Sequence, residues 1–396
     1  MYVFKSRAHS ELSDAVASSD VIIVGAGFFG SVIADVASRK FGLASTIIES
    51  RPHIGGNAYS YAEPSTGIEV HKYGSHLFHT SNERVIDWVT SFVELNDYVH
   101  RVFTTHKNQV FSMPINLHTM SQFFGSSLNP ASARKLIDSK KTRLPGRAQN
   151  LYEKGISSIG PELFDAFFGG YTAKQWQRDP RDLPAEVISR LPVRFSFDSR
   201  YFSESFQGVP VGGYGQWFER ILDNPQISTF LDLDFFDVRD LISGSGKTVV
   251  YSGPIDRYFN YSEGRLGWRT VDFEWETLES TADYQGCSVM NFADREVPHT
   301  RIHEFRHLHP EADHGEGTVI AREYSRQAQN SDEPYYPINT NDDRQMLARY
   351  RERAANEERV VFGGRLGSYQ YLDMHMAIAA ALNTLDTEVV PLVKQS

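Results

Sequence analysis

The sequence predicts an α/β fold built on a parallel β-sheet, because strand, glycine turn and helix patterns follow one another twice. Val21–Val24 is a short β-branched run, which is typical of a buried parallel strand. It leads directly into Gly25–Gly30, a G-x-G-x-x-G sequence that is followed by a helix expected over residues 31–39. Near the other end of the chain, Val360–Phe362 leads through glycines into a helix expected over residues 373–382. Both ends therefore contribute to one Rossmann-like framework.

The first glycine turn has the features of a dinucleotide-binding turn. Gly25 permits the tight turn, Gly27 lets the backbone approach a pyrophosphate, and Gly30 lets the helix pack closely on the strand. The N–H groups at the start of the helix can receive the phosphate charge. Glu49 follows a second strand expected over residues 45–48, where a carboxylate should accept hydrogen bonds from ribose hydroxyls. The alternative is a plain strand–turn–helix connection without a ligand.

The residues after Glu49 favour FAD over NAD. Arg51 follows the acidic residue closely, and Gly55 and Gly56 come next along the loop. This pattern resembles the second fingerprint of FAD-binding Rossmann flavoproteins, in which two glycines let a second backbone segment approach the cofactor. The sequence contains no second G-x-G-x-x-G for NAD(P)H. An ordinary loop is the alternative explanation for the two glycines.

Composition limits the possible classes of function. A chain of 396 residues can hold two or three domains, and its net charge of −10 argues against nucleic acid as a partner. We find no continuous apolar run near 18 residues, so we expect no membrane insertion. Residues 1–19 lack the apolar segment of a signal peptide and are expected to form a polar tail. The single cysteine, Cys287, fits a reducing cytoplasm.

Patterning divides the chain into four parts. The expected parts are a polar tail over 1–19, a discontinuous FAD-binding Rossmann-like domain over 20–98, 206–256 and 338–390, an inserted helical domain over 99–205, and an antiparallel β-sheet substrate domain over 257–337. Within the helical part, the proline-rich residues 177–194 predict a long mobile loop, and such loops are usually functional or disordered.

Several local features are expected from short patterns. Residues 102–113 alternate around a polar tip at 106–109, which predicts a β-hairpin. Ser81 is the candidate cap of a helix over residues 81–93. The sequence SGSGKT at residues 243–248 lacks the first glycine of a P-loop, so we expect a hairpin turn there instead.

Histidines give no metal prediction. His76 and His79 lie three residues apart, but no third ligand stands nearby in the sequence. A position of His76 against a flavin edge is the favoured interpretation, and a buried structural histidine is the alternative. The histidines between residues 299 and 314 would be scattered over both faces of a strand, so they also predict no metal site.

Eight motifs stand in one order along the chain, and together they resemble the bacterial UDP-galactopyranose mutase family. They are GAGFFG, RPHIGGNAY, HKYGSHLFHT, GYTAKQW, SRLPVR, VPHTRIHEFRH, EPYYPIN and GGRLGSYQYLDMHMAI. The similarity extends from about residue 20 to about residue 382. It implies a flavin-dependent isomerase that interconverts UDP-galactopyranose and UDP-galactofuranose without net redox. Reduced FAD is then the cofactor, with its N5 as covalent nucleophile at the anomeric carbon.

The resemblance also implies partners and a biological role. The partners are UDP-galactose in both ring forms and a reductant for the flavin, and the protein is expected to be a cytoplasmic homodimer. The product would supply galactofuranose for cell-surface glycan. The runner-up is an amine-oxidase-like FAD oxidoreductase that shares the FAD domain. The matched arginines and tyrosines favour a pyrophosphate ligand instead.

The motif matches imply roles for individual residues. The implied catalytic residues are Arg190 on the mobile loop, Arg301, His76 against the isoalloxazine, and Arg365 between flavin and substrate. The implied substrate contacts are Phe167, Tyr171, Thr172, Trp176, Tyr201, Asn291, Tyr336, Tyr371 and Asp373, with Trp176 stacked on the uracil. The implied FAD contacts are Gly25, Gly27, Phe29, Gly30, Glu49, Ser50, Gly56, Asn57, His76, Leu77, Arg365, Leu372, Asp373, Met374 and Ala377. Phe292 and His299 depart from the family pattern, which has tyrosines there.

Overall fold

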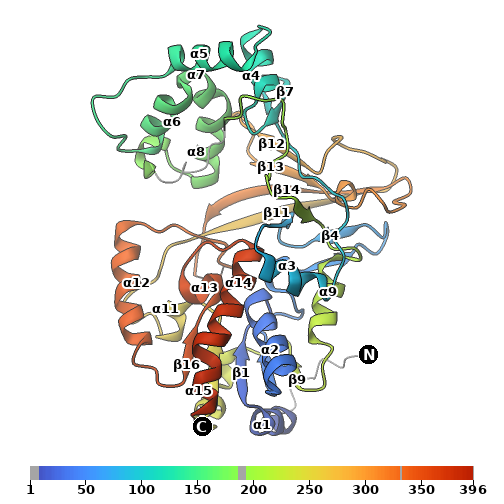
Figure 1. The fold of residues 1–396 in the computed structure, drawn as a ribbon, viewed down its shortest axis with the longest axis vertical. Coiled ribbons are helices and arrows are strands. Elements are labelled where there is room, and N and C mark those ends of the chain that lie inside the picture. Colours follow the sequence, from blue (N-terminus) through green and yellow to red (C-terminus); the bar gives the residue numbers. More distant parts are fainter. Residues whose placement is uncertain (1–8, 186–192, 331, 396) are drawn as a thin grey trace.

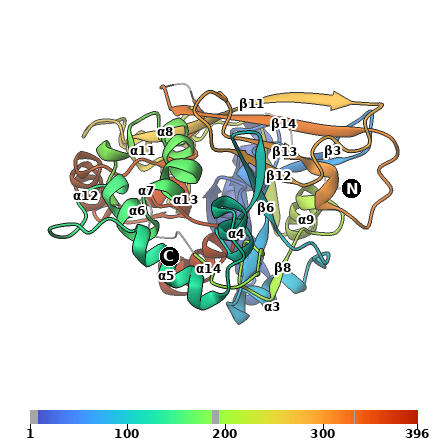
Figure 2. The ribbon, with the colours of Figure 1, turned by 90° about the horizontal axis from the view of Figure 1, so that it is seen from above.

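The computed structural model describes residues 9–185, 193–330 and 332–395, and Figure 1 shows their arrangement. The part built around the parallel sheet lies at one end of the molecule, and a group of helices lies at the other. Strands of a long, mostly antiparallel sheet lie between them in Figure 1, and in Figure 2, seen from above, β11 (Trp268–Leu278) and β14 (Thr318–Gln327) of this sheet run side by side. Arg190 and the centre of the expected mobile loop fall outside the described residues.

The predicted Rossmann-like framework is present as a five-stranded parallel sheet. Its strand order is β16-β10-β1-β2-β9, with β1 (Val21–Val24), β2 (Ser45–Ile48), β9 (Ile227–Phe230), β10 (Thr248–Tyr251) and β16 (Val360–Phe362). Side chains alternate between its two faces: Val21 and Ile23 join one apolar cluster, while Ile22 and Val24 join another. Helices α2 (Phe28–Phe41) and α14 (Met374–Thr384) pack together over the first cluster.

The expectation of a polar N-terminal tail is wrong for residues 9–18, which form helix α1 (His9–Ser18). Leu12, Ala15 and Val16 are buried in the second cluster, against the face of the sheet opposite α2. Their spacing of three and four residues makes one narrow apolar stripe in an otherwise polar segment. The prediction of a tail considered only a continuous apolar segment, as in a signal peptide, and three spaced apolar residues do not form one.

The second sheet has seven strands in the order β15-β11-β14-β13-β12-β6-β7. Its strands are β6 (Val102–His106), β7 (Gln109–Met113), β11 (Trp268–Leu278), β12 (Val289–Phe292), β13 (Arg301–Glu304), β14 (Thr318–Gln327) and β15 (Tyr336–Pro337). The predicted hairpin over 102–113 is confirmed as β6 and β7. It forms one edge of this sheet and pairs in parallel with β12, although the sequence assigned it to the helical part.

The helical part has its own apolar core. It contains α4 (Leu117–Phe124), α5 (Pro130–Lys140), α6 (Leu151–Ile159), α7 (Pro161–Phe164) and α8 (Gly170–Trp176). A π-helical turn, Asp165–Gly169, joins α7 directly to α8. Asn116, Asn129 and Asn150 cap three of these helices with their side chains, which satisfies N–H groups in the first turns.

The remaining elements surround these three parts. They are β3 (Ser60–Ala62), β4 (Glu69–His71), β5 (Phe78–Thr80), α3 (Glu83–Thr90), β8 (Phe206–Gly208), α9 (Gly213–Leu222), α10 (Arg239–Gly244), α11 (Ile255–Tyr258), α12 (Asn341–Ala354), α13 (Gly364–Ser368) and α15 (Val390–Lys394). Strand β3 pairs with β4, and β5 pairs with β8.

Two local predictions are corrected. The cap of α3 is Asn82 and not Ser81, because the Asn82 side chain accepts hydrogen bonds from the N–H groups of Arg84 and Val85. Residues 243–248 do not form a hairpin turn, since they lead from α10 into β10. Strand β10 runs parallel to both of its neighbours, and parallel strands cannot be joined by a hairpin.

One helical stretch among the described residues, Met374–Lys394, is long and apolar enough by length and composition to cross a membrane. The search for a continuous apolar run missed it because Asp386 and Glu388 interrupt it. Its first segment, α14, packs against α2, with Ile378 and Leu382 in the core. A helix in the core of a folded domain can have the same length and composition, so these two properties alone do not indicate a membrane span.

The packing of α1 can be measured directly. Leu12→Ala should lower the free energy of unfolding by about 2–4 kcal/mol, because it removes a buried side chain from the cluster on the sheet. The measurement is urea denaturation of the FAD-loaded protein. Asp14→Ala, on the exposed side of the same helix, should change that free energy by less than about 0.5 kcal/mol. Equal effects of the two substitutions would show that α1 does not pack on the sheet in solution.

Candidate active site

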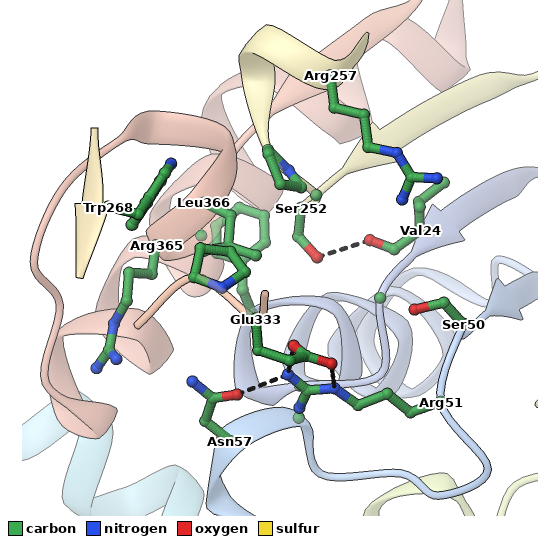
Figure 3. Close-up of a pocket in the computed structure, with 18 of the residues that line it drawn as sticks. Val24, Ser50, Arg51, Asn57, Ser252, Arg257, Trp268, Glu333, Arg365 and Leu366 are labelled. Atoms are coloured by element: carbon green, nitrogen blue, oxygen red, sulfur yellow. Dashed lines mark hydrogen bonds and ion pairs between the residues drawn. The ribbon is translucent and has the colours of Figure 1, made fainter. Parts of the chain in front are cut away.

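A cavity of about 880 Å³ lies at the carboxyl ends of the parallel strands. Val24, Glu49 and Tyr251 line it at or just after the ends of β1, β2 and β10. Trp268 and Glu333, which belong to or flank strands of the second sheet, line the opposite wall (Figure 3). Open parallel sheets bind ligands at this edge, so the fold places a cavity where the glycine turn requires one.

The glycine turn can accept no side chains at two of its positions. Gly25 has a φ of +103°, and a Cβ added there would lie 2.2 Å from Ser252 Oγ. That hydroxyl donates a hydrogen bond of 2.6 Å to the Val24 carbonyl, as Figure 3 shows. A Cβ at Gly30 would lie 2.0 Å from the Gly25 carbonyl oxygen. The turn therefore has the tight form that was predicted for it.

The second glycine pair touches the first turn at the edge of the cavity. A Cβ added at Gly56 would lie 3.1 Å from the Gly27 Cα. The Gly55 N–H donates a 2.9 Å hydrogen bond to the Ala26 carbonyl, which joins the two segments. Two backbone segments without side chains thus line one cavity, and this cradle fits the pyrophosphate of a dinucleotide.

Glu49 connects these segments. Its carboxylate accepts hydrogen bonds from the Ala26 N–H at 2.8 Å and the Arg51 N–H at 2.9 Å. Glu49 also lines the cavity next to Ser50, Asn57 and Phe29. The carboxylate therefore holds the glycine turn in place, and its hydrogen bonds to a ribose stay a prediction.

Sequence reasoning missed an ion pair beside the cradle. The Arg51 guanidinium donates to the Asn57 side chain at 2.9 Å and to both carboxylate oxygens of Glu333, one of them at 3.2 Å. Figure 3 shows the three side chains meeting at the edge of the cavity. Glu333 precedes β15, so this pair joins the FAD-binding part to the second sheet. No local pattern in the sequence connects two residues so far apart.

His76 and Arg365 line the part of the cavity expected to hold the flavin. The His76 Nδ1 lies 2.7 Å from the Gly74 carbonyl, so Nδ1 carries the proton. Burial lowers the pKa of His76 to about 4, and the nearby Arg365 adds to this effect. The imidazole is therefore neutral near pH 7, and its Nε2 is left as an acceptor. Arg365 donates to the Leu372 carbonyl at 2.6 Å.

The other predicted flavin contacts divide into two groups. Leu372, Met374 and Ala377 line the cavity. Leu77 is packed against the main core, and Asp373 is the N-cap residue of α14, so neither is among the lining residues. All of these flavin contacts remain predictions, since no ligand contact tests them.

A buried network extends from this region to the predicted pyrophosphate site. Arg301 Nε donates to a Glu323 carboxylate oxygen at 2.8 Å, and His303 Nε2 lies 3.1 Å from the other oxygen. On its far side, His303 Nδ1 lies 2.8 Å from Ser75 Oγ, next to His76. Burial alone would raise the pKa of Glu323, but Arg301 and His303 lower it to about 2. The carboxylate thus stays charged and fixes the direction of Arg301.

Tyrosines from two regions lie near Arg301, and a third tyrosine extends the group towards Arg365. Burial raises the pKa of Tyr171, on α8, to about 12, and the positive charge of Arg301 acts against this rise. Burial also raises the pKa of Tyr336, on β15, where Arg301 again opposes it. The Tyr336 and Tyr371 rings lie 5.8 Å apart, and the Arg365 guanidinium is 5.2 Å from the Tyr371 ring centre.

The remaining predicted substrate residues differ in position. Asn291 pairs with Arg301 across β12 and β13. Trp176 is half-buried at the end of α8, Thr172 is buried on the same helix, and Tyr201 is exposed. Neither Arg301 nor any of the predicted substrate residues is among those that line the cavity. Phe167 is only 3% exposed and packs 5.0 Å from the Phe111 ring in the helical core. A packing role explains its position without a ligand.

The two departures from the family pattern face each other. The Phe292 and His299 rings lie 4.4 Å apart in an edge-on arrangement, at opposite ends of the loop between β12 and β13. This aromatic pair closes the loop next to Asn291 and Arg301. Neither ring takes part in the Arg301–Glu323 pair.

His79 has two possible metal-ligating neighbours that the sequence did not reveal. The sequence offered no third ligand nearby, but Asp373 and His375 come from the other end of the chain to lie within 4.8 Å of His79. A second such group among the described residues is Asp283, Glu304 and His307. Neither group holds more than three potential ligands, and neither is assigned a metal.

These features define a flavoprotein of the Rossmann type, with FAD as its cofactor. Residues 23–92 match the family model of an NAD(P)-binding Rossmann-like domain, and residues 166–371 match that of UDP-galactopyranose mutase. A probable UDP-galactopyranose mutase of Klebsiella pneumoniae is 45% identical, covering 93% of this chain and 94% of that protein. The chain belongs to the UDP-galactopyranose mutase family.

Other relatives extend this comparison. A dTDP-fucopyranose mutase of Escherichia coli is 39% identical, covering 91% of this chain and 96% of that protein. A crystal structure of reduced UDP-galactopyranose mutase matches the fold with a TM-score of 0.69 at 14% identity, covering 94% of each chain. A putrescine oxidase matches with a TM-score of 0.55 at 13% identity, covering 94% of this chain and 99% of the other. These two structures show the fold alone.

The glycine cradle can be tested with one substitution. Gly25→Ala should abolish FAD retention, because the added Cβ would meet Ser252 Oγ in a backbone conformation that alanine rarely adopts. The measurement is flavin absorbance per protein after gel filtration. Gly42→Ala is the matched control: Gly42 also has a positive φ, but its Cβ would enter open space. Gly42→Ala should lose roughly 1 kcal/mol of stability and keep its FAD. Full FAD content in Gly25→Ala would contradict this account of the turn.

Buried histidines should make stability depend on pH. Burial lowers the pKa of His53 to about 4 and that of His100 to about 3, from about 6.5 in an unfolded chain. Below pH 6.5 the unfolded chain binds protons that the folded protein excludes, so the free energy of unfolding falls as pH drops. The loss should be roughly 2 kcal/mol per buried histidine at pH 5, relative to pH 7.

The test is chemical denaturation at pH 7 and pH 5. His100→Asn should reduce the difference in stability between the two pH values, because it removes one of these groups. His118→Asn, an exposed position on α4, serves as the control and should leave the difference unchanged. An unaltered difference in His100→Asn would mean that folding does not lower the pKa of His100.

Proposed function

We propose that this protein interconverts UDP-galactopyranose and UDP-galactofuranose, using reduced FAD without net oxidation or reduction. The observation that carries the proposal is the Arg301–Glu323 pair, which holds a directed guanidinium near Tyr171 and Tyr336. Tyr336 in turn lies near Arg365, which lines the cavity. An arginine in this setting can bind a diphosphate with two directed hydrogen bonds. The 45% identity over most of the chain to a probable UDP-galactopyranose mutase supports the choice of substrate.

In this proposal the residues of the chain bind, orient and stabilise. Trp176 offers a flat face for the uracil, and Arg301 takes the charge of the diphosphate, which also stabilises UDP when it departs. Tyr336 and Tyr371 supply phenol donors beside Arg365. When bound and reduced, FAD supplies N5 as a nucleophile for the anomeric carbon. Neutral His76, with its proton on Nδ1, offers Nε2 as an acceptor at the flavin edge.

Other parts of the proposal rest on family resemblance. Arg190 is proposed to close onto the diphosphate from the mobile loop, and it lies outside the described residues. We further propose a cytoplasmic homodimer that receives electrons from a cellular reductant and supplies galactofuranose for cell-surface glycan. The single cysteine supports a reducing compartment.

A dTDP-linked fucose is a second candidate substrate. The 39% identical relative is named a dTDP-fucopyranose mutase, and it covers nearly the same part of this chain. Both names describe a mutase that acts on a pyranose sugar carried by a nucleoside diphosphate. The amine-oxidase-like alternative shares the fold, as the putrescine oxidase match illustrates. It gives no role to the Arg301–Glu323 pair.

The proposal is tested by incubating the purified protein with UDP-galactofuranose, with and without dithionite, and separating the products by anion-exchange chromatography. Conversion to UDP-galactopyranose only in the reduced protein is the expected result. Parallel reactions with dTDP-fucofuranose measure the preference for the nucleotide sugar. Conversion of neither substrate by protein that carries reducible FAD would reject the proposal. Equal rates with oxidised flavin would reject the role of reduced FAD.

A further inference from the structure

One lysine attaches helix α8 to the loop between β12 and β13 of the second sheet. The Lys174 ammonium lies within 3.0 Å of four backbone carbonyl oxygens in the loop between β12 and β13. They belong to Phe292, Asp294, Val297 and His299, at 2.7, 2.9, 2.9 and 3.0 Å. An ammonium has three N–H donors, so these carbonyls satisfy all of them. We call this arrangement the Lys174 clamp.

A glycine on the same helix brings the two backbones together. Gly170 precedes Lys174 by four residues, so both lie on one face of α8. A Cβ added at Gly170 would lie 2.3 Å from the Ala293 carbonyl oxygen and 3.1 Å from the Arg295 side chain. The backbone of the helix therefore contacts the loop directly. Beside this contact, the Lys174 ammonium is surrounded by carbonyl oxygens of the loop.

The carboxyl end of α8 is attached to the sheet as well. The Gln175 carbonyl, near the end of the helix, accepts hydrogen bonds from Arg269 at 2.8 Å and from Ser325 Oγ at 2.7 Å. These residues lie on β11 and β14, so α8 is fixed to the sheet from two directions. The loop is itself held at Asp294, whose carboxylate accepts from the Lys107 N–H at 2.8 Å and lies 2.6 Å from His106 Nδ1.

The clamp joins residues that the proposed function assigns to one ligand. Helix α8 carries Tyr171 and Trp176, the proposed uracil end. The loop begins just after Asn291 and ends just before Arg301, the proposed diphosphate end. A nucleoside diphosphate has a fixed length between its base and its phosphates. The two ends of its site must therefore be held at a matching distance, and Lys174 lies where the two supporting segments meet.

We propose that Lys174 is a positioning residue for nucleotide binding, which sets the distance between the base-binding face of α8 and Arg301 without touching the substrate. This inference rests on the proposed function. Burial lowers the pKa of Lys174 to about 8, although the Asp294 and Glu296 carboxylates favour its charged form. Replacing Lys174 by an apolar residue would leave its carbonyl partners without a donor, so the loop and α8 should move apart.

The test compares Lys174→Met with Lys135→Met in the FAD-loaded protein. Lys135 is an exposed lysine on α5 in the same helical part and serves as the matched control. Lys174→Met should raise the KM for UDP-galactofuranose and the Kd for UDP tenfold or more, while kcat at saturating substrate stays within about threefold. Lys135→Met should match the unmodified protein. A fall in kcat with KM and Kd unchanged would show a merely structural role and would overturn the inference.

Two further measurements keep the inference decidable. Gly170→Ala should push α8 away from the loop without removing a charge, so it should also raise the KM. This variant provides the test if Lys174→Met does not fold. Hydrogen–deuterium exchange should increase at residues 170–176 and 292–300 in Lys174→Met, and unchanged exchange there would overturn the clamp. If the unmodified protein binds UDP but converts no substrate, the proposed function fails while the UDP affinities still decide the role of Lys174. Absence of UDP binding would overturn both.

Discussion

The proposed site depends on the ion pair between the charged Glu323 carboxylate and Arg301. The carboxylate is almost fully buried, and two charged or polar partners, Arg301 and His303, use its two oxygens. Arg301 is largely withdrawn from water, and without this partner its guanidinium would be costly to desolvate and would not be held in one direction. Through His303 the same carboxylate reaches Ser75, beside His76. One acidic side chain therefore fixes the proposed anion site and supports the loop at the flavin end of the cavity.

The three parts of the chain meet around this network, and each supplies what the others lack. The parallel sheet provides a rigid edge where backbone segments without side chains can hold a dinucleotide. The second sheet provides Arg301 at the start of β13 and Glu323 on the neighbouring strand β14. The helical part provides aromatic side chains on α8, which Lys174 and Arg269 attach to the sheet. A ligand lying across all three would bind only if these attachments keep their spacing.

Local patterns predicted the features that arise from local physics. The glycine turn, the acidic residue after β2 and the hairpin over 102–113 all follow from spacing and residue type, and the structure confirms their positions. The spacing of Leu12, Ala15 and Val16 also follows a helical period and could have predicted α1. The polar composition of the surrounding residues led to the prediction of a tail instead. By contrast, the pairs Arg51–Glu333 and Arg301–Glu323 and the four carbonyls around Lys174 depend on tertiary folding. Nothing in a single sequence states which charges will be neighbours, and the order of family motifs supplied the role of Arg301 but not its partner.

A crystal structure of the reduced, FAD-loaded protein with UDP would show whether one site joins the flavin cavity to a nucleotide site. We expect the isoalloxazine beside His76 and Arg365, the uracil against Trp176, and the diphosphate within salt-bridge distance of Arg301. Density for UDP elsewhere on the molecule, or a diphosphate remote from Arg301 while FAD occupies the cavity, would contradict this expectation.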